Sequence, residues 1–449
     1  MISIRSFTRV VVALSGLAGH AALAQDPVAL SLGGAARMAA ERTAAPEAAR
    51  LRVTQAEARV EQRRAEFLPS VSAAALDNER NFNSASFGIS FADPATGRSL
   101  FDPNGQVLGP VKTWDLRGSM RQSIYDPGAF ARMRAARANV TALGADVGTA
   151  SQQAAAVAAI AYVRALRADA QLGARAADST LAAELLVIAR DQVAAGVGVA
   201  LDVTRAQSQL SVMHSQLIAA RGERDRSRLD LARALGLPAG TPVTLSDSLV
   251  SLPVDVAAPS EGDALARATR TRADLLAMSE QSAAVGLQLD AIRTEVLPAL
   301  SLFADQGITG KATQHMLSTY SWGIMLSVPV FDGFRRDGRM DEQRAALKEL
   351  DVRHRDLTQQ AATDVRAALL DIQTAREQLG AAQERVGLAE QELAQARDRF
   401  RAGVSGNADA ISASLTLNAA RTQVVDARAS LQAARVALGR AQGTVTELP

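Results

Sequence analysis

The chain has 449 residues, enough for two or three domains of ordinary size. Hydrophobic residues make up 48% of it and aromatic residues only 4%, while alanine alone accounts for about a fifth. This usage is typical of long packed helices rather than of a β-sandwich or a compact α/β enzyme. The formal net charge of +2 falls to zero without Arg5 and Arg9, which argues against nucleic acid as a partner. With no cysteine and only four histidines, we expect no disulfide, no metal site, no cofactor and no enzyme.

Residues 1–24 have the pattern of a secretory signal peptide. Arg5 and Arg9 give a positive start, an apolar run follows from Val10 to Leu17, and Ala22-Leu23-Ala24 is a small-residue cleavage pattern. The apolar run is too short to anchor the chain across about 30 Å of hydrocarbon, and no later stretch reaches about 18 uncharged apolar residues. The sequence therefore predicts an exported chain that would cross any membrane with strands.

Three strings recur along the chain, which indicates an internal duplication. RAEFLPSVSAAA at 64–75 returns as RTEVLPALSLFA at 293–304, and SIYDPGAFARMRAARA at 123–138 returns as PVFDGFRRDGRMDEQRAA at 329–346. RDQVAAGVGVALDV at 190–203 returns as RDRFRAGVSGNADAI at 397–411 without a gap, at an offset of 207. We therefore divide the chain into a signal peptide (1–24), a first structural repeat (25–240), a linker (241–258), a second repeat (259–441) and a C-terminal tail (442–449).

Each repeat is predicted to contain a long helical hairpin. Apolar residues in the second repeat alternate steps of three and four, as in a coiled-coil seam: Val365, Ala368, Ile372, Ala375, Leu379, Ala382, Val386, Ala389, Leu393, Ala396 and Phe400. Moved back by 207, the same seam is present in the first repeat, although Arg175 and Ser179 weaken it. Glycines at 196 and 403 should end the long helices, and returning helices should run to about Gly236 and Gly439.

Four strands are expected between these helices, near 68–80, 113–125, 298–307 and 318–330. Tyr320, Trp322, Ile324, Leu326 and Val328 alternate with polar or small residues, and so do Trp114, Leu116, Met120 and Ile124. Such alternation alone fits a surface hairpin of a soluble sheet, but its length also fits a tilted membrane strand of about 9–11 residues. The polar segment 81–112 is expected to form a long exposed loop.

Four strands cannot close a barrel within one chain. Open sheet edges in a bilayer cost several kcal/mol for each unpaired group, and single-chain bacterial barrels begin at about eight strands. Two copies would give eight strands and three would give twelve. A transport role favours three copies, because twelve strands leave an open lumen.

The chain resembles the TolC family of outer-membrane efflux proteins. The resemblance rests on LSLGGAARMAAERTAAPEAA at 30–49, the two Leu-Pro strand starts, Thr271-Arg272-Ala273-Asp274-Leu275, the string WGIMLSVPVFDG at 322–333 and the duplicated Gly-Val tips. It implies an α+β membrane protein: a homotrimer with a twelve-stranded outer-membrane barrel, four strands per chain, continued by a periplasmic α-helical barrel. It also implies the outer-membrane channel of a tripartite efflux or type I secretion system, docked on a periplasmic adaptor and an inner-membrane transporter. Without cysteine, the chain is similar to the unacylated branch of the family.

The resemblance also suggests functional residues. Gly196, Val197, Gly403 and Val404 are expected at the periplasmic tip, either as plain helix ends or as the surface on which an adaptor docks. Asp202 is either a helix N-cap or part of that tip, and Asp409 is either a cap or the acidic ring of the channel constriction. The family's second acidic position falls on Ser412. Trp114, Tyr320 and Trp322 are expected anchors in outer-membrane lipid, whereas His214 and Arg421, equivalent in the repeat, are expected on solvated helix faces.

The competing class is a periplasmic adaptor or a trimeric coiled-coil surface protein. An adaptor would carry a single helical hairpin between lipoyl-like and β-barrel segments. A surface adhesin would lack the duplicated junctions between strands and long helices. Two hairpins that alternate with two strand pairs favour the channel.

Overall fold

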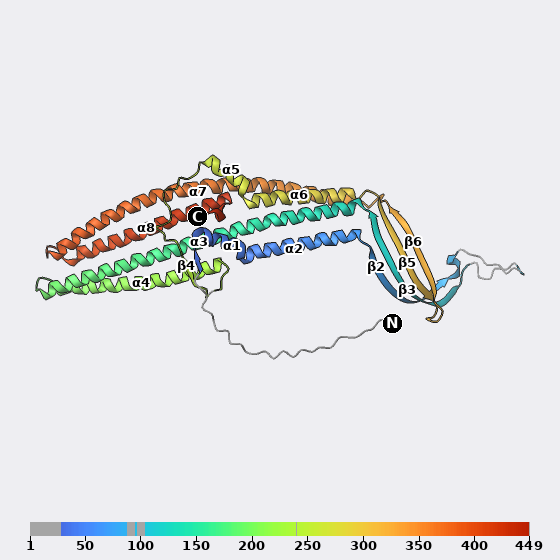
Figure 1. Cartoon of the computed structure of the whole chain (residues 1–449), viewed down its shortest axis with the longest axis horizontal. Helices are drawn as coiled ribbons and strands as arrows, with labels where there is room; N and C mark the ends of the chain where they lie inside the picture. Colours follow the sequence, from blue (N-terminus) through green and yellow to red (C-terminus); the bar gives the residue numbers. More distant parts are fainter. Residues whose placement is uncertain (1–27, 88–94, 97–103, 239, 449) are drawn as a thin grey trace.

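The computed structural model describes residues 28–87, 95–96, 104–238 and 240–448. The predicted signal peptide at 1–24 lies outside these residues. The molecule is elongated, with helices along its long axis and a four-stranded sheet at one end (Figure 1). The ends of two helical hairpins lie at the opposite end, side by side.

Each repeat contains four helices that differ in length, and the helices of the two repeats match one by one. In the first repeat they are α1 (Leu32–Arg42), α2 (Ala44–Arg64), α3 (Pro127–Ala194) and α4 (Ala200–Ala234). In the second they are α5 (Glu261–Thr271), α6 (Ala273–Thr294), α7 (Arg335–Arg401) and α8 (Asn407–Gln442). At 1.5 Å per residue, α3 and α7 are rods of about 100 Å, and they form the long arms of the two predicted helical hairpins.

The strands of the described residues form two sheets. β2 (Ser70–Asn83), β3 (Val107–Tyr125), β5 (Ala299–Gly310) and β6 (Leu317–Ser327) form an antiparallel sheet in the order β2-β3-β5-β6. β1 (Val28–Leu30) and β4 (Val243–Leu245) pair in parallel beside the helices, so the predicted linker 241–258 contains a short strand.

The predicted loop 81–112 is wrong at both ends. β2 continues to Asn83 and β3 begins at Val107, because Phe82 pairs with Leu108 and Asn83 with Val107. The polar residues there do not end the strands, since the hairpin ladder satisfies their backbone groups.

The predicted end of the last helix near Gly439 is also wrong. The helix continues to Gln442, and the residue with left-handed backbone (φ 73°) is Gly443.

The seam predicted in the second repeat is confirmed. All of its residues are buried except Val386 and Ala396, which are partly buried against the same cluster. In the first repeat Ala158, Ala165, Ala168, Ala182, Leu186 and Ala189 are buried, while Val193 is exposed. Alanine dominates these seams because it lets helices approach closely.

The main core lies where α1, α3, α4 and α8 meet, near the middle of the molecule. Tyr162 of α3 is fully buried there, and its hydroxyl donates to Leu30 O at 2.7 Å and lies 3.0 Å from Asp247 Oδ2. Burial raises the pKa of Tyr162 to about 12. Val445, beyond α8, is buried in the same cluster. This core therefore joins both repeats with the segment that connects them.

Candidate channel and docking sites

The two hairpin tips end their long helices in the same way. Gly196 has φ 72° and Gly403 has φ 70°, the left-handed conformation that glycine adopts without a Cβ penalty. Val197 N donates to Gln192 O and Val404 N donates to Arg399 O, both at 3.0 Å, which closes a Schellman motif in each tip. Both valines are exposed, so each tip presents an apolar side chain to its surroundings.

The alternative role of Asp202 and Asp409 as helix N-caps is wrong. The N-cap residues are Val199 for α4 and Gly406 for α8, and neither helix has a side-chain cap. Both aspartates stand in the first helical turn, where a carboxylate favours the positive end of the helix dipole. Both α4 and α8 begin earlier than expected. The residue with extended backbone directly before the first turn is Val199 in α4 and Gly406 in α8.

The surroundings of the two aspartates differ. Asp202 is buried and its carboxylate lies 3.9 Å from Arg205, whereas Asp409 is exposed. The buried side-chain amide of Asn407 in α8 donates to the backbone oxygen of Asp202 at 2.5 Å, which joins the starts of α4 and α8. The duplication therefore produces one sheltered and one open carboxylate at equivalent positions.

The tips are held together within the chain. Gln192 Nε2 of α3 donates to Phe400 O of α7 at 2.5 Å. Beneath this bond lies an apolar cluster shared by both hairpins: Leu185, Leu186, Ala189, Ala206, Phe400 and Ala410. The predicted tip residues are therefore brought together at one end of the molecule.

The large sheet has two chemically different faces. Pairing registers place Met120, Ala304 and Trp322 in one row and Gly118, Gln306 and Tyr320 in the next, on the face predicted to be apolar. Tyr320 and Trp322 are 77% and 71% exposed, whereas Trp114 is partly covered by Lys112, whose Nζ lies 5.2 Å from the ring centroid. An exposed aromatic face on an antiparallel sheet is typical of a lipid-facing surface.

The opposite face of the sheet is polar. Arg117 of β3 forms ion pairs with Asp115 and with Asp305 of β5, and its Nη2 donates to Thr319 Oγ1 at 3.0 Å. This division between an apolar and a polar face is what a barrel strand with a watery lumen requires.

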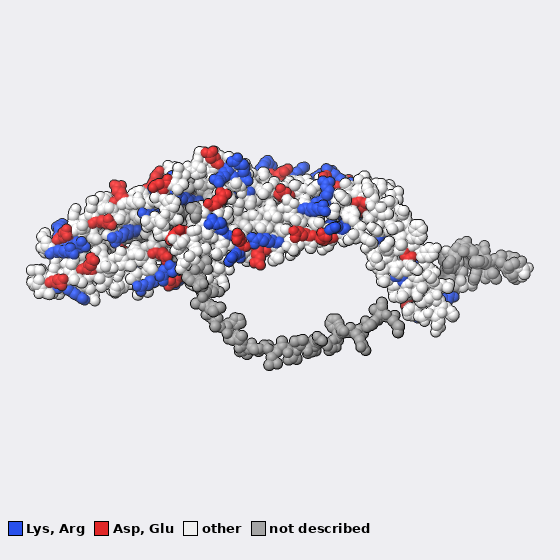
Figure 2. All heavy atoms as spheres, viewed as in Figure 1, with Lys and Arg blue, Asp and Glu red and all other residues white. Residues whose placement is uncertain are grey.

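Along the helices, acidic and basic groups are mixed, whereas the sheet is mostly uncharged on the side drawn in Figure 2.

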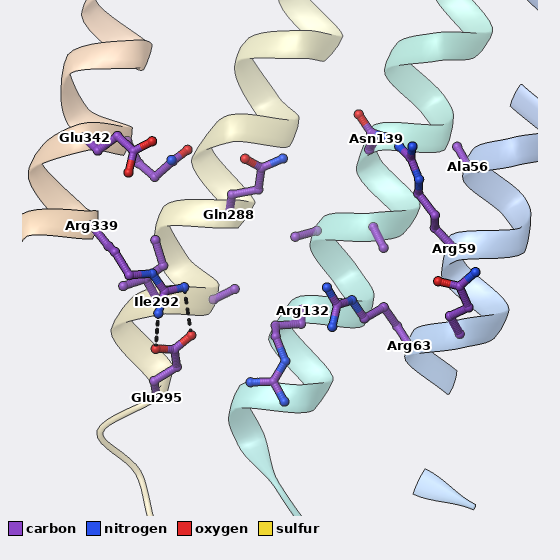
Figure 3. A pocket seen from close by; sticks show the side chains of 15 residues that line it. Ala56, Arg59, Arg63, Arg132, Asn139, Gln288, Ile292, Glu295, Arg339 and Glu342 are labelled. Atoms are coloured by element: carbon purple, nitrogen blue, oxygen red, sulfur yellow. Dashed lines mark hydrogen bonds and ion pairs between the residues drawn. The ribbon is translucent and has the colours of Figure 1, made fainter. Parts of the chain in front are cut away.

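A pocket of about 660 Å³ lies where α2, α3, α6 and α7 approach the sheet (Figure 3). Arginines from three of these helices line it, and two of them form equivalent ion pairs. Arg132 Nη2 lies 2.9 Å from Glu66, and Arg339 Nη1 lies 2.7 Å from Glu295. Sequence reasoning missed these pairs, although the aligned strings RAEF and RTEV contain both glutamates.

The Arg-x-Asp-Leu string forms the corner between α5 and α6. Arg272 is nearly buried, with its Nη2 2.7 Å from Asp274 and its Nη1 3.1 Å from Asp364 of α7. Burial raises the pKa of Asp274, but the hydrogen bonds and charge of Arg272 outweigh burial and hold it below its ordinary value. The motif therefore fixes a corner of the fold.

Arg421 is not on a freely solvated face, which corrects the prediction for this residue. Its Nη1 lies 3.5 Å from Asp178 of α3, which is only 2% exposed and also lies 3.4 Å from Arg175. Burial raises the pKa of Asp178 although both arginines oppose the shift. Its equivalent, His214, is exposed as predicted. The weak seam positions Arg175 and Ser179 flank this buried carboxylate.

Within the described ranges, no three histidine, aspartate or glutamate side chains cluster as a metal site would require. In the same residues, no helix is both long and apolar enough to cross a membrane.

Comparison with known proteins shows which family has this architecture. A family model described as outer membrane efflux protein matches residues 36–237 and 264–444, one match for each repeat. A comparison with curated protein sequences gives no significant match.

Solved structures share the fold at low sequence identity. A membrane protein from Pseudomonas aeruginosa is 19% identical with a TM-score of 0.72, over 92% of this chain and 93% of that one. The outer membrane protein VceC of Vibrio cholerae is 18% identical with a TM-score of 0.70, over 92% and 96%. The CmeC outer membrane channel of Campylobacter jejuni is 16% identical with a TM-score of 0.69, over 92% and 85%.

Long helices joined to a four-stranded sheet with an apolar face define an outer-membrane channel subunit rather than an enzyme. The chain belongs to the outer membrane efflux protein family. Its sheet lies in the outer membrane and its helices extend into the periplasm. Channels of this family form trimers that work with efflux pumps. The periplasmic adaptor and the adhesin are therefore excluded.

Proposed function

We propose that three copies of this chain form one export channel with a twelve-stranded barrel. The observation that carries the proposal is the pair of open edges in the sheet. In the described residues, β2 pairs only with β3, and β6 pairs only with β5. In hydrocarbon each unpaired backbone group costs several kcal/mol, so β6 of one copy would pair with β2 of the next.

The hairpin tips would dock on a periplasmic adaptor and, through it, on an inner-membrane transporter. Val197 and Val404 support this role, because both are exposed apolar side chains at the end of a rod about 100 Å from the sheet. Gly196, Gly403 and Asp202 would shape the same surface. A drug efflux pump and a type I protein secretion system are both compatible with such a tip.

Asp409 would line the channel at its periplasmic constriction. Its exposure beside the tip supports this role, and three copies would bring three carboxylates around one axis. Such acidic rings favour cations. Ser412 carries no charge one turn later, so we propose a single ring.

Trp114, Tyr320 and Trp322 would hold the barrel in outer-membrane lipid. The exposure of Tyr320 and Trp322 on the apolar sheet face supports this role, since aromatic rings prefer the membrane interface.

The test is the oligomeric state and conductance of the native protein. Detergent-solubilised outer membranes should yield a trimer by crosslinking and mass measurement, and the purified trimer should form cation-selective pores in planar bilayers. Crosslinking that stops at dimers, or a monomer that keeps its strand content, would contradict the proposal.

A further inference from the structure

The internal duplication allows the two halves of the pocket beside the sheet to be compared with each other. One half lies between α2 and α3 and the other between α6 and α7 (Figure 3). Arg132 in the first half and Arg339 in the second are equivalent at the repeat offset of 207, and each forms an ion pair with a glutamate that precedes a strand pair. Because this ion pair is common to both halves, we assign it to the architecture of the junction.

The first half carries two further arginines that the second half lacks. The recurring strings RAEF and RTEV set an offset of 229 between α2 and α6, so Arg59 is equivalent to Gln288. At the same offset Arg63 is equivalent to Ile292, and all four of these residues line the pocket. Since glutamine and isoleucine occupy the equivalent positions in the second repeat, the fold of the junction does not require arginine at either one.

The second half carries an acidic residue that the first half lacks. Glu342 of α7 lines the pocket, and its equivalent in α3 is Ala135. The two halves have therefore diverged in opposite directions, and positive charge collects between α2 and α3.

The arginines of the first half outnumber their acidic partners. Arg63 Nη1 lies 2.7 Å from one oxygen of Glu66, and Arg132 Nη2 lies 2.9 Å from the other. Arg132 also lies 3.5 Å from Asp126. Arg59 is exposed and, among the residues that the structure describes, has no ion-pair or hydrogen-bond partner. Three guanidinium groups therefore meet two carboxylates, and an anion entering this half would find an unpaired cation.

Guanidinium groups from two helices suit a phosphate group as the ligand. Each planar guanidinium can donate to two phosphate oxygens at once, and Figure 3 shows Arg59 and Arg63 extending from α2 toward α3. The volume of about 660 Å³ is within the range of small-molecule pockets. Among the residues that line it, only Ile292 has a large apolar side chain, so the pocket favours a polar ligand over an apolar one.

The site also lies close to the membrane surface. Arg63 precedes Ser70, the first residue of β2, by seven residues, which is about 11 Å at 1.5 Å per residue. The headgroup layer of a bilayer extends about 5–8 Å beyond the hydrocarbon on each side. An extended arginine side chain can cover the remaining distance. A phospholipid headgroup of the periplasmic leaflet and a phosphate-bearing solute of the periplasm are therefore both within reach.

We propose that Arg59, Arg63 and Arg132 bind a phosphate group, carried either by a phospholipid headgroup or by a phosphate-bearing solute. Arg132 remains anchored by Glu66, while Arg59 and Arg63 supply the donors that the second repeat lacks. The inference rests on the position of the sheet in the outer membrane and not on the trimer.

The protein purified in a phosphate-free detergent and buffer tests this site. Arg59→Gln with Arg63→Gln removes the two additional arginines and leaves the ion pair of Arg132 in place. Arg134→Gln with Arg137→Gln is the matched control, because it removes the same charge from exposed positions of α3 that do not line the pocket.

Two sets of probes distinguish the sources of the phosphate. Inorganic phosphate and glycerol 3-phosphate, titrated by calorimetry, represent the solute. Dioleoylphosphatidylglycerol, counted on the intact protein by native mass spectrometry, represents the lipid headgroup, and dioleoylglycerol is its phosphate-free counterpart.

We expect the native protein and the control variant to bind at least one phosphate probe, and the pocket variant to bind it at least about tenfold more weakly, which equals about 1.4 kcal/mol. A loss confined to phosphatidylglycerol would assign the headgroup as the ligand, and a loss confined to the soluble probes would assign a solute. Equal binding by all three proteins, an equal loss in the control variant, or dioleoylglycerol bound as tightly as phosphatidylglycerol would overturn the proposal.

Arg59→Gln alone keeps the test valid if the double variant does not fold. Arg59 is exposed, and glutamine already occupies the equivalent position 288. Its thermal unfolding without ligand should equal that of the native protein, while its affinity for the phosphate probe should fall about threefold or more. An unchanged affinity in this variant would also overturn the proposal.

Discussion

Glu295 at the end of α6 accepts hydrogen bonds of 2.7 and 3.1 Å from Arg339 in the second turn of α7. The first repeat contains the same contact between Glu66 and Arg132. In both cases the glutamate precedes a pair of strands and the arginine follows it. The ion pair therefore joins the two ends of the segment that enters the membrane.

Loss of this pair should weaken the junction between helices and sheet. In a double-mutant cycle with Glu295→Gln and Arg339→Gln, we expect a coupling energy of about 1 kcal/mol. The pair is bidentate but partly exposed, so solvent screening keeps its coupling energy well below that of a buried ion pair. Thermal dissociation of the purified trimer would measure it.

The ion pair of Asp341 with Arg344 on the same helix is the matched control. It is exposed on both sides and joins residues three apart, so its coupling should be about 0.3 kcal/mol or less. Equal coupling in the two cycles would show that the Glu295 contact is only a surface pair.

The sequence predicts those parts of this fold that depend on periodicity or duplication. Steps of three and four residues identify the seam of α7, and alternation identifies the face of Trp322, because one buried or lipid-facing side imposes a period on the sequence. The strand ends were missed because Phe82 and Val107 are extended by pairing across a hairpin, which local composition does not record. Asp178 was missed for a related reason. Its partner Arg421 is distant in the sequence, and only packing brings α8 against α3.

Gly403→Val should impair export while leaving the barrel assembled. Nothing lies within 4 Å of a Cβ at this position, so the cost arises from the backbone. A β-branched residue at φ 70° is strained by roughly 1–2 kcal/mol, which would distort the tip turn. Export assays combined with trimer yield would measure both effects.

Gly387→Ala is the control for this substitution. Gly387 lies inside α7, 14 residues before the helix ends, with open space around it, and alanine should stabilise the helix by up to about 1 kcal/mol without changing export. Normal export by Gly403→Val would show that the tip turn is not critical.

Asp178→Asn should flatten the dependence of stability on pH. The pKa of Asp178 is raised above its ordinary 3.8, chiefly by burial, so the folded chain holds this proton more tightly than the unfolded chain. Its stabilising contribution is therefore complete below 3.8 and is lost as the pH rises through the folded-state pKa. Asparagine cannot ionise, so the stability of the Asp178→Asn variant relative to the native chain should increase as the pH rises from 3.8 through the folded-state pKa of Asp178. Parallel denaturation midpoints for the two proteins from pH 3 to 8 would contradict the prediction.

Asp409→Ala should reduce cation selectivity and block by trivalent cations in bilayer recordings. If three Asp409 carboxylates surround the periplasmic mouth, two unit charges about 8 Å apart repel by roughly 2 kcal/mol at an effective dielectric constant of 20. A multivalent cation relieves this repulsion, and alanine removes it. Asp202→Ala is the matched control, because Asp202 is equivalent in the repeat but is buried beside Arg205 and so should change selectivity less. Equal effects would mean that both aspartates line the pore. Unchanged selectivity in Asp409→Ala would place this carboxylate outside the lumen.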